Sequence, residues 1–309
     1  MTEIRPDRSL YFKLNRKVVV ITGGATGIGK SAVRKFTDAG AKVVFGDVSL
    51  RNGRALQAEI GESVSAFVPC DVTSYDQQLR LFATAEQKFG GVDIVIANAG
   101  ISDPIDIFDV AFDVNKEPNL KEIDVNLKGV IYTAKIGMSY LRKRGGGTMV
   151  LVSSIAGFKE STSLTPYLAS KHGVIGVLRG LRLSAVKENI FVNAICPWMT
   201  TTGMVAGIRD GWESRHLPRN EPEDVAESMM MCATAETADR AGTTHQGAQI
   251  PFSGKILFVA GGKSYEIEDA MQALEPEWLG RDNSRALQIG QEYLMSSETS
   301  WAPINQSKI

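Results

Sequence analysis

Hydrophobic residues gather in seven short, continuous runs along the chain. The runs are rich in β-branched residues, and hydrophobic positions do not alternate with polar ones within them. Continuous runs of this length predict strands that are covered on both faces, as in a parallel sheet. The predicted strands comprise residues 17–22, 41–47, 65–70, 92–98, 148–153, 190–196 and 255–259.

Amphipathic stretches with helical spacing lie between most of these runs. A strand followed by a helix, repeated along the chain, is typical of an open α/β sheet. We therefore predict a Rossmann-like, doubly wound, seven-stranded parallel sheet with helices on both faces. The predicted helices comprise residues 28–39, 53–60, 75–89, 120–142, 168–187 and 221–235.

The chain of 309 residues reads as a single domain with an extension at each end. Residues 16–262 hold all the predicted strands and helices and form the expected Rossmann-like domain. Residues 1–15 are polar overall, with an aromatic pair, and form an N-terminal extension. Residues 263–309 follow the last strand and form a C-terminal extension. Its aromatic residues favour a tail that packs on the protein over one that is disordered in solvent.

Composition excludes several classes of protein. The net charge is −1, whereas a nucleic-acid-binding protein normally carries a basic excess. Apolar runs stay well short of a membrane helix, and the first residues lack the apolar stretch of a secretion signal. The three cysteines are far apart and favour a reducing compartment, so we expect a cytoplasmic protein. Metal-ligand spacing is missing among His, Cys and Asp, so we expect no metal.

A glycine-rich turn follows the first predicted strand and leads into the first predicted helix. Glycine permits a tight turn and lets a phosphate approach backbone N–H groups, while the helix N-terminus adds its positive dipole end. Glycines also serve ordinary turns, but a strand before and a helix after this one favour a dinucleotide site. The residues expected to contact the cofactor here are Gly23, Thr26, Gly27, Ile28 and Gly29.

Asp47 ends the second predicted strand, 18 residues after Gly29. A carboxylate at this place accepts hydrogen bonds from the adenosine ribose and repels a 2′-phosphate, so NAD(H) is favoured and NADP(H) remains open. The alternative is an ordinary acidic residue that closes a strand. Asp71 and Val72 follow the third strand, where the adenine edge would rest.

Tyr167 and Lys171 are one helical turn apart, and Ser154 ends the fifth predicted strand. An ammonium group near a phenol lowers the pKa of the phenol, which makes tyrosine a usable general base near neutral pH. Ligands of an open α/β sheet bind at the carboxyl ends of its strands. We therefore expect Ser154, the glycine turn and Asn98 to meet in one crevice.

These motifs, in this order and spacing, resemble the short-chain dehydrogenase/reductase family over residues 17–262. The resemblance implies that Tyr167 transfers a proton, Ser154 orients the substrate oxygen, Lys171 binds the nicotinamide ribose, and Asn126 holds a relay water. It rests on residues 22–29, Asp71, the Asn98-Ala99-Gly100 triplet, Asn126, Ser154, Tyr167, Lys171 and residues 193–197. Further cofactor contacts expected from it are Asn98, Ala99, Gly100, Pro197, Thr200 and Thr202.

The chain departs from the family pattern at Trp198, which follows Pro197 where the family usually has glycine. Tryptophan does not adopt glycine-like backbone angles cheaply, so the replacement leaves the geometry of this loop open but not the assignment of the cofactor. The segment 199–217 is expected to cover the substrate pocket, or alternatively to pack on its own protein. Its apolar side chains favour an apolar, ring-bearing substrate. The expected pocket residues are Ser154, Tyr167, Trp198, Met204 and Trp212.

The expected function is hydride transfer between NAD(H) and a secondary alcohol or ketone of an apolar, polycyclic or polyketide-like substrate. Alternatives are an epimerisation, dehydration or cyclisation at the same site, or a cofactor-binding sensor or scaffold. The C-terminal tail is similar to fungal members near the 15-hydroxyprostaglandin and hydroxyaverantin dehydrogenases, which implies secondary-metabolite biosynthesis.

The resemblance also implies a homodimer or homotetramer, because members of the family usually pair through the helices predicted at 120–142 and 168–187. An apolar stripe on the second of these helices is the expected dimer seam, with packing onto the sheet as the alternative. The stripe consists of Val174, Val177, Leu178 and Leu181. Neither nucleic acid nor a membrane is an expected partner.

Overall fold

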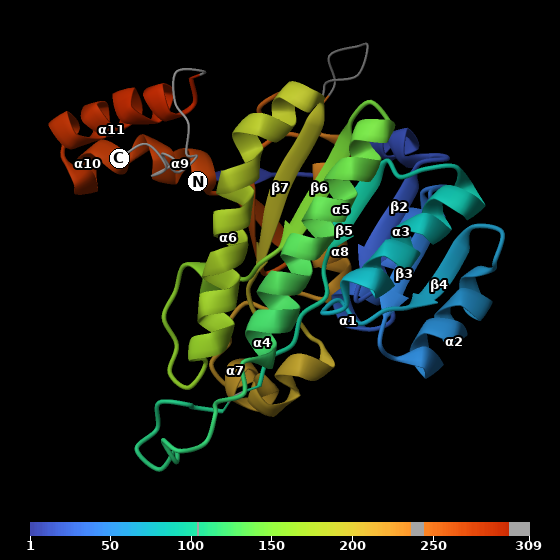
Figure 1. Cartoon of the computed structure of the whole chain (residues 1–309), viewed down its shortest axis with the longest axis horizontal. Helices are drawn as coiled ribbons and strands as arrows, with labels where there is room; N and C mark the ends of the chain where they lie inside the picture. The colour runs from blue at the N-terminus through green and yellow to red at the C-terminus, as the bar shows by residue number, and fades with distance from the viewer. Residues whose placement is uncertain (104, 236–243, 297–309) are drawn as a thin grey trace, which may run out of the picture. The chain divides into compact units, whose positions relative to one another are not determined.

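A nine-stranded sheet forms the centre of the protein in a computed structural model that describes residues 1–103, 105–235 and 244–296 (Figure 1). The strand order is β1-β9-β8-β7-β6-β5-β2-β3-β4. The chain divides into two units, Met1–Ile267 with the whole sheet and Glu268–Ile309. The strands are β1 (Thr2–Ile4), β2 (Val18–Thr22), β3 (Lys42–Asp47), β4 (Ser65–Pro69), β5 (Ile94–Ala97), β6 (Gly147–Val152), β7 (Ile190–Pro197), β8 (Ile256–Ala260) and β9 (Lys263–Glu266).

The seven predicted strands are confirmed as β2 to β8, which pair in parallel. The predicted total of seven was wrong, because β9 turns back antiparallel on β8 and β1 pairs antiparallel with β9. Both added strands have only three or four residues, and β9 lies in the segment expected to form the C-terminal extension. The fold is therefore a mostly parallel, Rossmann-like α/β sheet with a short antiparallel edge.

Helices cover both faces of the sheet. On one face lie α1 (Gly27–Asp38), α2 (Leu50–Ile60) and α8 (Pro222–Thr234). On the other face lie α3 (Tyr75–Phe89), α5 (Gly129–Lys143) and α6 (Thr165–Ala185), which stand in front of the sheet in Figure 1. The strands are thus buried on both sides, which is why their sequences show no polar alternation.

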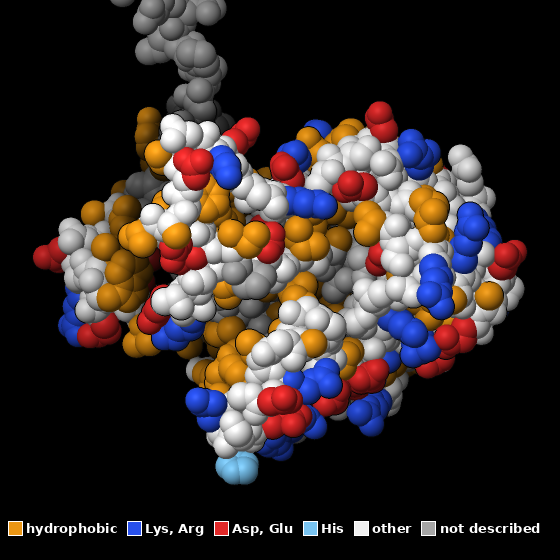
Figure 2. Space-filling view, turned by 90° about the horizontal axis from the view of Figure 1, so that it is seen from below, with side chains coloured by type: hydrophobic (Ala, Val, Ile, Leu, Met, Phe, Trp, Pro, Cys, Tyr) orange, Lys and Arg blue, Asp and Glu red, His pale blue; other side chains and the backbone are white. Residues whose placement is uncertain are grey.

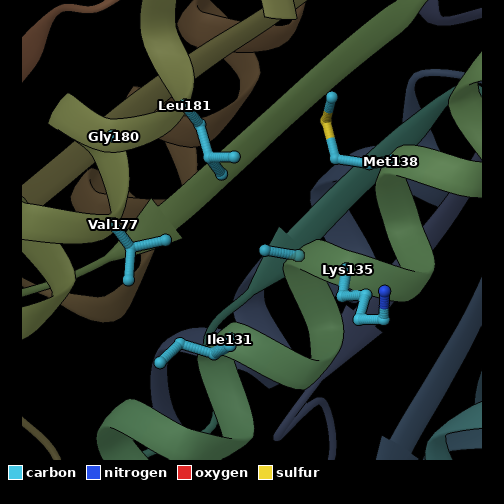
Figure 3. A pocket seen from close by; sticks show the side chains of 7 residues that line it. Ile131, Lys135, Met138, Val177, Gly180 and Leu181 are labelled. Atoms are coloured by element: carbon cyan, nitrogen blue, oxygen red, sulfur yellow. The ribbon is translucent and has the colours of Figure 1, made fainter. Parts of the chain in front are cut away.

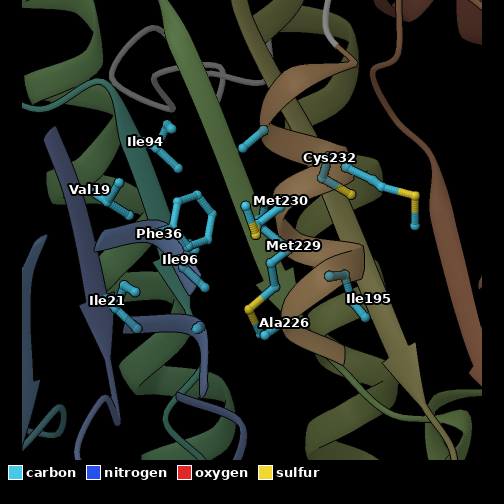
Figure 4. Close-up of a cluster of buried hydrophobic side chains, with 14 of the residues drawn as sticks. Val19, Ile21, Phe36, Ile94, Ile96, Ile195, Ala226, Met229, Met230 and Cys232 are labelled. Carbon is cyan, nitrogen blue, oxygen red and sulfur yellow. The ribbon is translucent and has the colours of Figure 1, made fainter. Parts of the chain in front are cut away.

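The larger core lies between the sheet and the helices α1 and α8 (Figure 4). Phe36 of α1 meets Met229 and Met230 of α8 above the strands, and all three side chains are buried. Unbranched methionine fills irregular space between two helices and a twisted sheet. The strands contribute β-branched side chains, among them Val19, Ile21, Ile94, Ile96 and Ile195.

The helix predicted at 120–142 is interrupted. It consists of α4 (Lys121–Ile123), a π-helical turn η2 (Asp124–Lys128) and then α5. A π turn inserts an extra residue into the helical ladder and often marks a functional place. Here the turn contains Asn126, which is fully buried.

The N-terminal residues are built into the first unit. Leu10 and Leu14 of the 3₁₀ helix η1 (Arg8–Leu14) are buried against it. Glu227 of α8 accepts hydrogen bonds from Arg8 and Tyr11, which fastens this segment to α8.

Shorter helices connect and extend these elements. In the first unit they are η3 (Ile155–Gly157), η4 (Val186–Glu188), η5 (Gly203–Ile208) and α7 (Arg209–Glu213). The second unit contains α9 (Glu268–Ala273), α10 (Glu275–Leu279) and α11 (Arg281–Leu294), and the part of the expected C-terminal extension from residue 297 lies outside the described residues. Among the described helices, none combines the length and the apolar character needed to span a membrane.

Candidate active site

The strand order changes direction between β2 and β5, and the candidate site lies at the carboxyl ends of these strands. Neighbouring connections leave in opposite directions at such a point and open a crevice for ligands. The molecule viewed from below is hollowed near its centre, with hydrophobic side chains around the hollow (Figure 2). This edge of the sheet carries the glycine turn, Asn98, Ser154 and the start of α6.

The glycine turn fits tightly against the end of β5. A side chain at Gly23, whose φ is +66°, would place its Cβ 2.7 Å from the Cα of Ala99. A Cβ on Gly29 would lie 1.9 Å from the carbonyl oxygen of Gly23, so both positions require glycine. Asn98 completes the arrangement, because its amide nitrogen donates to the carbonyl oxygens of Thr22 and Gly23 at 3.0 and 2.9 Å.

The first turn of α1 faces this crevice without a side-chain cap. Thr26 is the N-cap residue, and its hydroxyl makes no capping hydrogen bond. Unsatisfied backbone N–H groups and the positive dipole end of a helix favour a phosphate. Thr202 lies over the same turn, since a Cβ on Gly27 would come within 3.3 Å of its methyl group.

Asp47 makes backbone hydrogen bonds that the sequence did not reveal. Its carboxylate accepts hydrogen bonds from the backbone N–H groups of Ala25, at 3.0 Å, and Ser49, at 2.9 Å. The residue therefore ties the end of β3 to the glycine turn. A carboxylate has about four acceptor positions, so two remain for the hydroxyl groups of a ribose.

Asp71 and Val72 stand next along this edge, after β4. The Asp71 carboxylate accepts from the backbone N–H and the hydroxyl of Thr73 at 2.9 and 2.8 Å. Val72 is buried against Gly129, where a Cβ would approach the valine side chain to 2.8 Å. These contacts fix the wall on which we expected the adenine to rest.

Tyr167, Lys171 and Ser154 come together as the spacing predicts. Pro166 is the second residue of α6 and Tyr167 lies in the first turn of this helix, while Ser154 caps η3 shortly after β6. Tyr167 and Ser154 share a hydrogen bond, and Lys171 Nζ lies 5.6 Å from the centre of the Tyr167 ring. The side chain of Lys171 is buried, and Nζ donates to the carbonyl oxygen of Val152 at 3.1 Å.

Asn126 joins this group through Gly100. A Cβ on Gly100 would lie 3.4 Å from both Asn126 Oδ1 and Lys171 Nζ. The Asn126 amide exchanges two hydrogen bonds of 2.8 Å with the backbone of Ile101 and donates to Ser170 Oγ at 3.2 Å. Its side chain therefore anchors the chain that leaves β5.

Comparison with known proteins gives the same assignment as this geometry. The sequence model of the short chain dehydrogenase family matches residues 17–212. The chain belongs to this family. It is 33% identical over 283 residues to the short-chain dehydrogenase/reductase prx4 of Penicillium rubens, which covers 88% of this chain and 83% of that protein.

Two further relatives extend the comparison. The short-chain dehydrogenase/reductase ascJ of Acremonium egyptiacum is 40% identical over 214 residues, or 66% of this chain and 70% of that protein. (+)-Borneol dehydrogenase 1 of Salvia officinalis is 33% identical over 195 residues, or 63% of this chain and 74% of that protein. The protein is therefore an oxidoreductase of the short-chain dehydrogenase family.

Short-chain dehydrogenases generally bind NAD(P), and the residues present fit such a cofactor. The glycine turn leads into the first turn of α1, whose backbone N–H groups have no side-chain cap and can bind a diphosphate. The buried Lys171 ammonium makes one hydrogen bond to protein among the described residues, although it has three protons to donate. Ribose hydroxyl groups are suitable acceptors for the others.

Burial changes the proton affinities of the two central groups. It raises the pKa of Tyr167 above its usual range, and the hydrogen bond from Ser154 opposes this, while Glu122 and Cys196 add to it. Burial also lowers the pKa of Lys171 to about 8. The expected lowering of the Tyr167 pKa is thus absent from the protein alone, because desolvation of the phenolate outweighs the nearby ammonium.

Trp198 does not have the positive φ angle that would favour glycine at this position. It is absent from the described residues with positive φ, and its N–H donates to the carbonyl oxygen of Val259 at 2.9 Å. Its ring meets that of Trp212 edge-on, with centroids 5.2 Å apart, and lies 6.2 Å from that of Phe258. The backbone at Trp198 therefore has a conformation that does not require glycine.

The segment after Trp198 is closed at its base. Thr200 and Asn220 form a β-bridge, and the Asn220 amide donates to the carbonyl oxygen of Val259 at 2.8 Å. The Thr200 hydroxyl donates a hydrogen bond to the carbonyl oxygen of Trp198 at 3.0 Å. Met204, further along this segment, is half exposed.

Proposed function

We propose that the protein is an NAD(H)-dependent enzyme that interconverts a secondary alcohol and a ketone. The observation that carries this proposal is the buried Tyr167, which has Ser154 as its hydrogen-bond partner and the Lys171 ammonium beside its ring. The group stands at the same edge of the sheet as the glycine turn and Asp47. A proton-transfer residue is thereby combined with a nucleotide crevice in an oxidoreductase family.

Tyr167 moves the proton in the proposed reaction. In the oxidative direction its phenolate oxygen accepts the proton of the substrate hydroxyl, and in the reductive direction its hydroxyl returns a proton to the carbonyl oxygen. The bound nicotinamide supplies the hydride acceptor or donor. Ser154 donates a hydrogen bond to the substrate oxygen and orients it. The Lys171 ammonium favours the phenolate and binds the ribose, and Asn126 keeps the backbone at Ile101 beside this lysine.

The preference for NAD(H) is assigned to Asp47. Its carboxylate is buried and already directed by two backbone N–H groups. A second negative charge from a 2′-phosphate would meet it at close range and in a poorly solvated place. The remaining acceptor positions suit the two uncharged ribose hydroxyls of NAD(H).

The proposed substrate is apolar and ring-bearing. We take the segment 198–217 as the cover of the substrate pocket, where Trp198, Trp212 and the half-exposed Met204 present a mainly hydrophobic wall. The name of the Salvia relative gives borneol, a compact bicyclic secondary alcohol, as the compound it oxidises. With two fungal relatives, this supports a role in secondary-metabolite synthesis.

Three buried cysteines without a disulfide support a reducing, cytoplasmic setting.

A homodimer is the proposed assembly. An open groove of about 350 Å³ runs between α5 and α6, where Ile131 and Met138 face Val177 and Leu181 (Figure 3). Two members of the expected seam, Val174 and Leu178, are instead fully buried within the protein. The interface would therefore use the outer half of that stripe together with α5.

The direct test follows absorbance at the NADH band during incubation with a panel of cyclic and aromatic secondary alcohols and ketones. Turnover by the wild type and its loss in Tyr167→Phe support the proposal. Tyr132→Phe is the matched control, since Tyr132 packs against Tyr75 on the outer side of α5. A wild type that binds NADH but converts no member of a broad panel would favour a sensor or a non-redox reaction.

A further inference from the structure

Glu122 is a buried acidic residue four positions before Asn126. Only 3% of its surface is exposed, although it is the middle residue of the short helix α4. Residues four apart lie on one side of a helix, so Glu122 and Asn126 face the same neighbour. That neighbour is the segment Gly100–Asp103, where the chain leaves β5.

The two side chains hold alternate residues of this segment. Asn126 takes both the N–H and the carbonyl group of Ile101, each at 2.8 Å. Glu122 Oε1 accepts a hydrogen bond from the backbone N–H of Asp103, also at 2.8 Å. The segment is therefore fastened along α4 and η2 at two successive points.

The segment leads directly from the cofactor side of the site toward its substrate side. It begins at Gly100, onto which Asn126 and Lys171 converge. Three residues beyond Asp103, the Asp106 carboxylate accepts a hydrogen bond from the hydroxyl of Ser163 at 3.3 Å. Ser163 lies just before α6, which carries Tyr167. The position of Asp103 thus affects both the backbone at Gly100 and the segment before α6, which lie around Tyr167.

Burying a carboxylate to hold the backbone of Asp103 costs free energy. Among the described residues, Glu122 has no ion-pair partner, and a neutral backbone N–H is the hydrogen-bond donor to it. Burial without a cation costs free energy, and here it raises the pKa of the Glu122 carboxyl group. An apolar residue would fill the same space at lower cost, so the acid is better explained by its contact with Asp103.

We infer that Glu122 is a positioning residue. It fixes the backbone at Asp103 and thereby the path of the Gly100–Asp103 segment along the substrate side of the active site. This inference rests on the proposed function. It also has an electrostatic consequence for Tyr167, because α4 packs against α6 and an ionised Glu122 disfavours the phenolate. The other groups that act on Tyr167 are Ser154, Lys171 and Cys196.

Two substitutions separate the hydrogen bond from the charge. Glu122→Gln keeps a carbonyl acceptor for Asp103 and removes the charge, whereas Glu122→Met keeps the length and removes both. Glu117→Gln is the matched control, because it removes one carboxylate from an exposed position nearby. Variants are compared only after thermal unfolding shows a folded protein.

The first measurements need no turnover. Hydrogen exchange of the Asp103 amide is expected to quicken about tenfold in Glu122→Met and to stay within about threefold in Glu122→Gln, as for the loss of one net hydrogen bond. Ultraviolet titration, taken as a difference from Tyr167→Phe, is expected to give a lower midpoint for Tyr167 in both Glu122 variants. Neither quantity should change in Glu117→Gln.

The kinetic measurement shows whether the position matters for the reaction. Glu122→Met is expected to raise KM about tenfold with a smaller effect on kcat, and Glu122→Gln is expected to restore KM. Unchanged exchange at Asp103 in Glu122→Met would overturn the inference, and so would faster exchange with unchanged KM and Tyr167 midpoint. If the wild type converts no substrate, the proposed function fails, while exchange and titration still decide on Glu122.

Discussion

Asp47 Oδ2 accepts a hydrogen bond from the backbone N–H of Ala25 at 3.0 Å, so the residue assigned to the ribose also holds the glycine turn. The two roles need different chemistry. The turn needs an acceptor oxygen, whereas discrimination against a 2′-phosphate needs the negative charge. Substitutions at this position can therefore change cofactor preference with or without loosening the turn.

Asp47→Asn keeps an acceptor oxygen and loses the charge. We expect the ratio of NADPH to NADH affinity to rise by at least about tenfold, because one charge–charge repulsion is removed. Asp47→Ala should change the ratio similarly and weaken both cofactors, because the Ala25 contact is lost. Fluorescence titration with each cofactor measures this, with Asp38→Asn as a control. A wild type that binds NADPH more tightly would contradict the assignment.

The three residues around the substrate oxygen should differ in their effects. Tyr167→Phe removes only the oxygen that transfers the proton, so kcat should fall by 10²–10⁴-fold or more while NADH affinity stays nearly constant. Ser154→Ala should have a smaller effect, because it orients the substrate without reacting. Lys171→Ala should lower both kcat and cofactor affinity. Steady-state kinetics and NADH titration check the order, and a Tyr167→Phe enzyme with most of its rate would refute the mechanism.

Lys171 should make the protein less stable near neutral pH. Its pKa is about 8 in the folded protein and near the ordinary value of 10.5 when unfolded, so the unfolded chain binds more protons between these values. The free energy of unfolding then rises with pH across that window, and the full cost is present below it.

Lys171→Met should accordingly raise the free energy of unfolding by about 3 kcal/mol at pH 7, and by about 1 kcal/mol less at pH 9. Urea unfolding without added cofactor measures both values. Lys187→Met, at an exposed lysine after the same helix, should change stability by less than about 0.5 kcal/mol. A destabilised Lys171→Met protein would show that the contact with Val152 outweighs desolvation.

The groove between α5 and α6 should control assembly. Leu181→Glu places a charge among Ile131, Met138 and Val177, where a second copy would have to desolvate it. We expect light scattering to show a wild-type dimer and a Leu181→Glu mass near the 33.5 kDa monomer. Leu183→Glu, at a half-exposed position outside that groove, should remain dimeric. A monomeric wild type would reject this interface.

Most of the sheet was predictable because its strands are marked by local sequence. Continuous runs such as that in β2 report burial on both faces, and the helices between them impose parallel pairing. The edge strands were missed for the opposite reason. Thr2–Ile4 has too few residues to show a pattern, and its partner Glu266 is near the other end of the domain.

The candidate site shows the same limit. The motif spacing placed Tyr167, Lys171 and Ser154 together, because helix and strand geometry fix such distances. It did not reveal that burial dominates the pKa of Tyr167, since burial depends on the whole fold. Glu122 was missed as well, because a single acidic residue in an amphipathic stretch resembles a solvated one until its neighbours are known.

The pairing of β1 with β9 sets an order of events during synthesis. The residues of β1 leave the ribosome before the other strands of this sheet, but Glu266 and its neighbours, with which they pair, are the last strand of the sheet to emerge. The hairpin of β8 and β9 must form before β1 has an edge to join. The first strand to be made is thus the last to be placed, and until then the edge of β9 is open to strands of other chains.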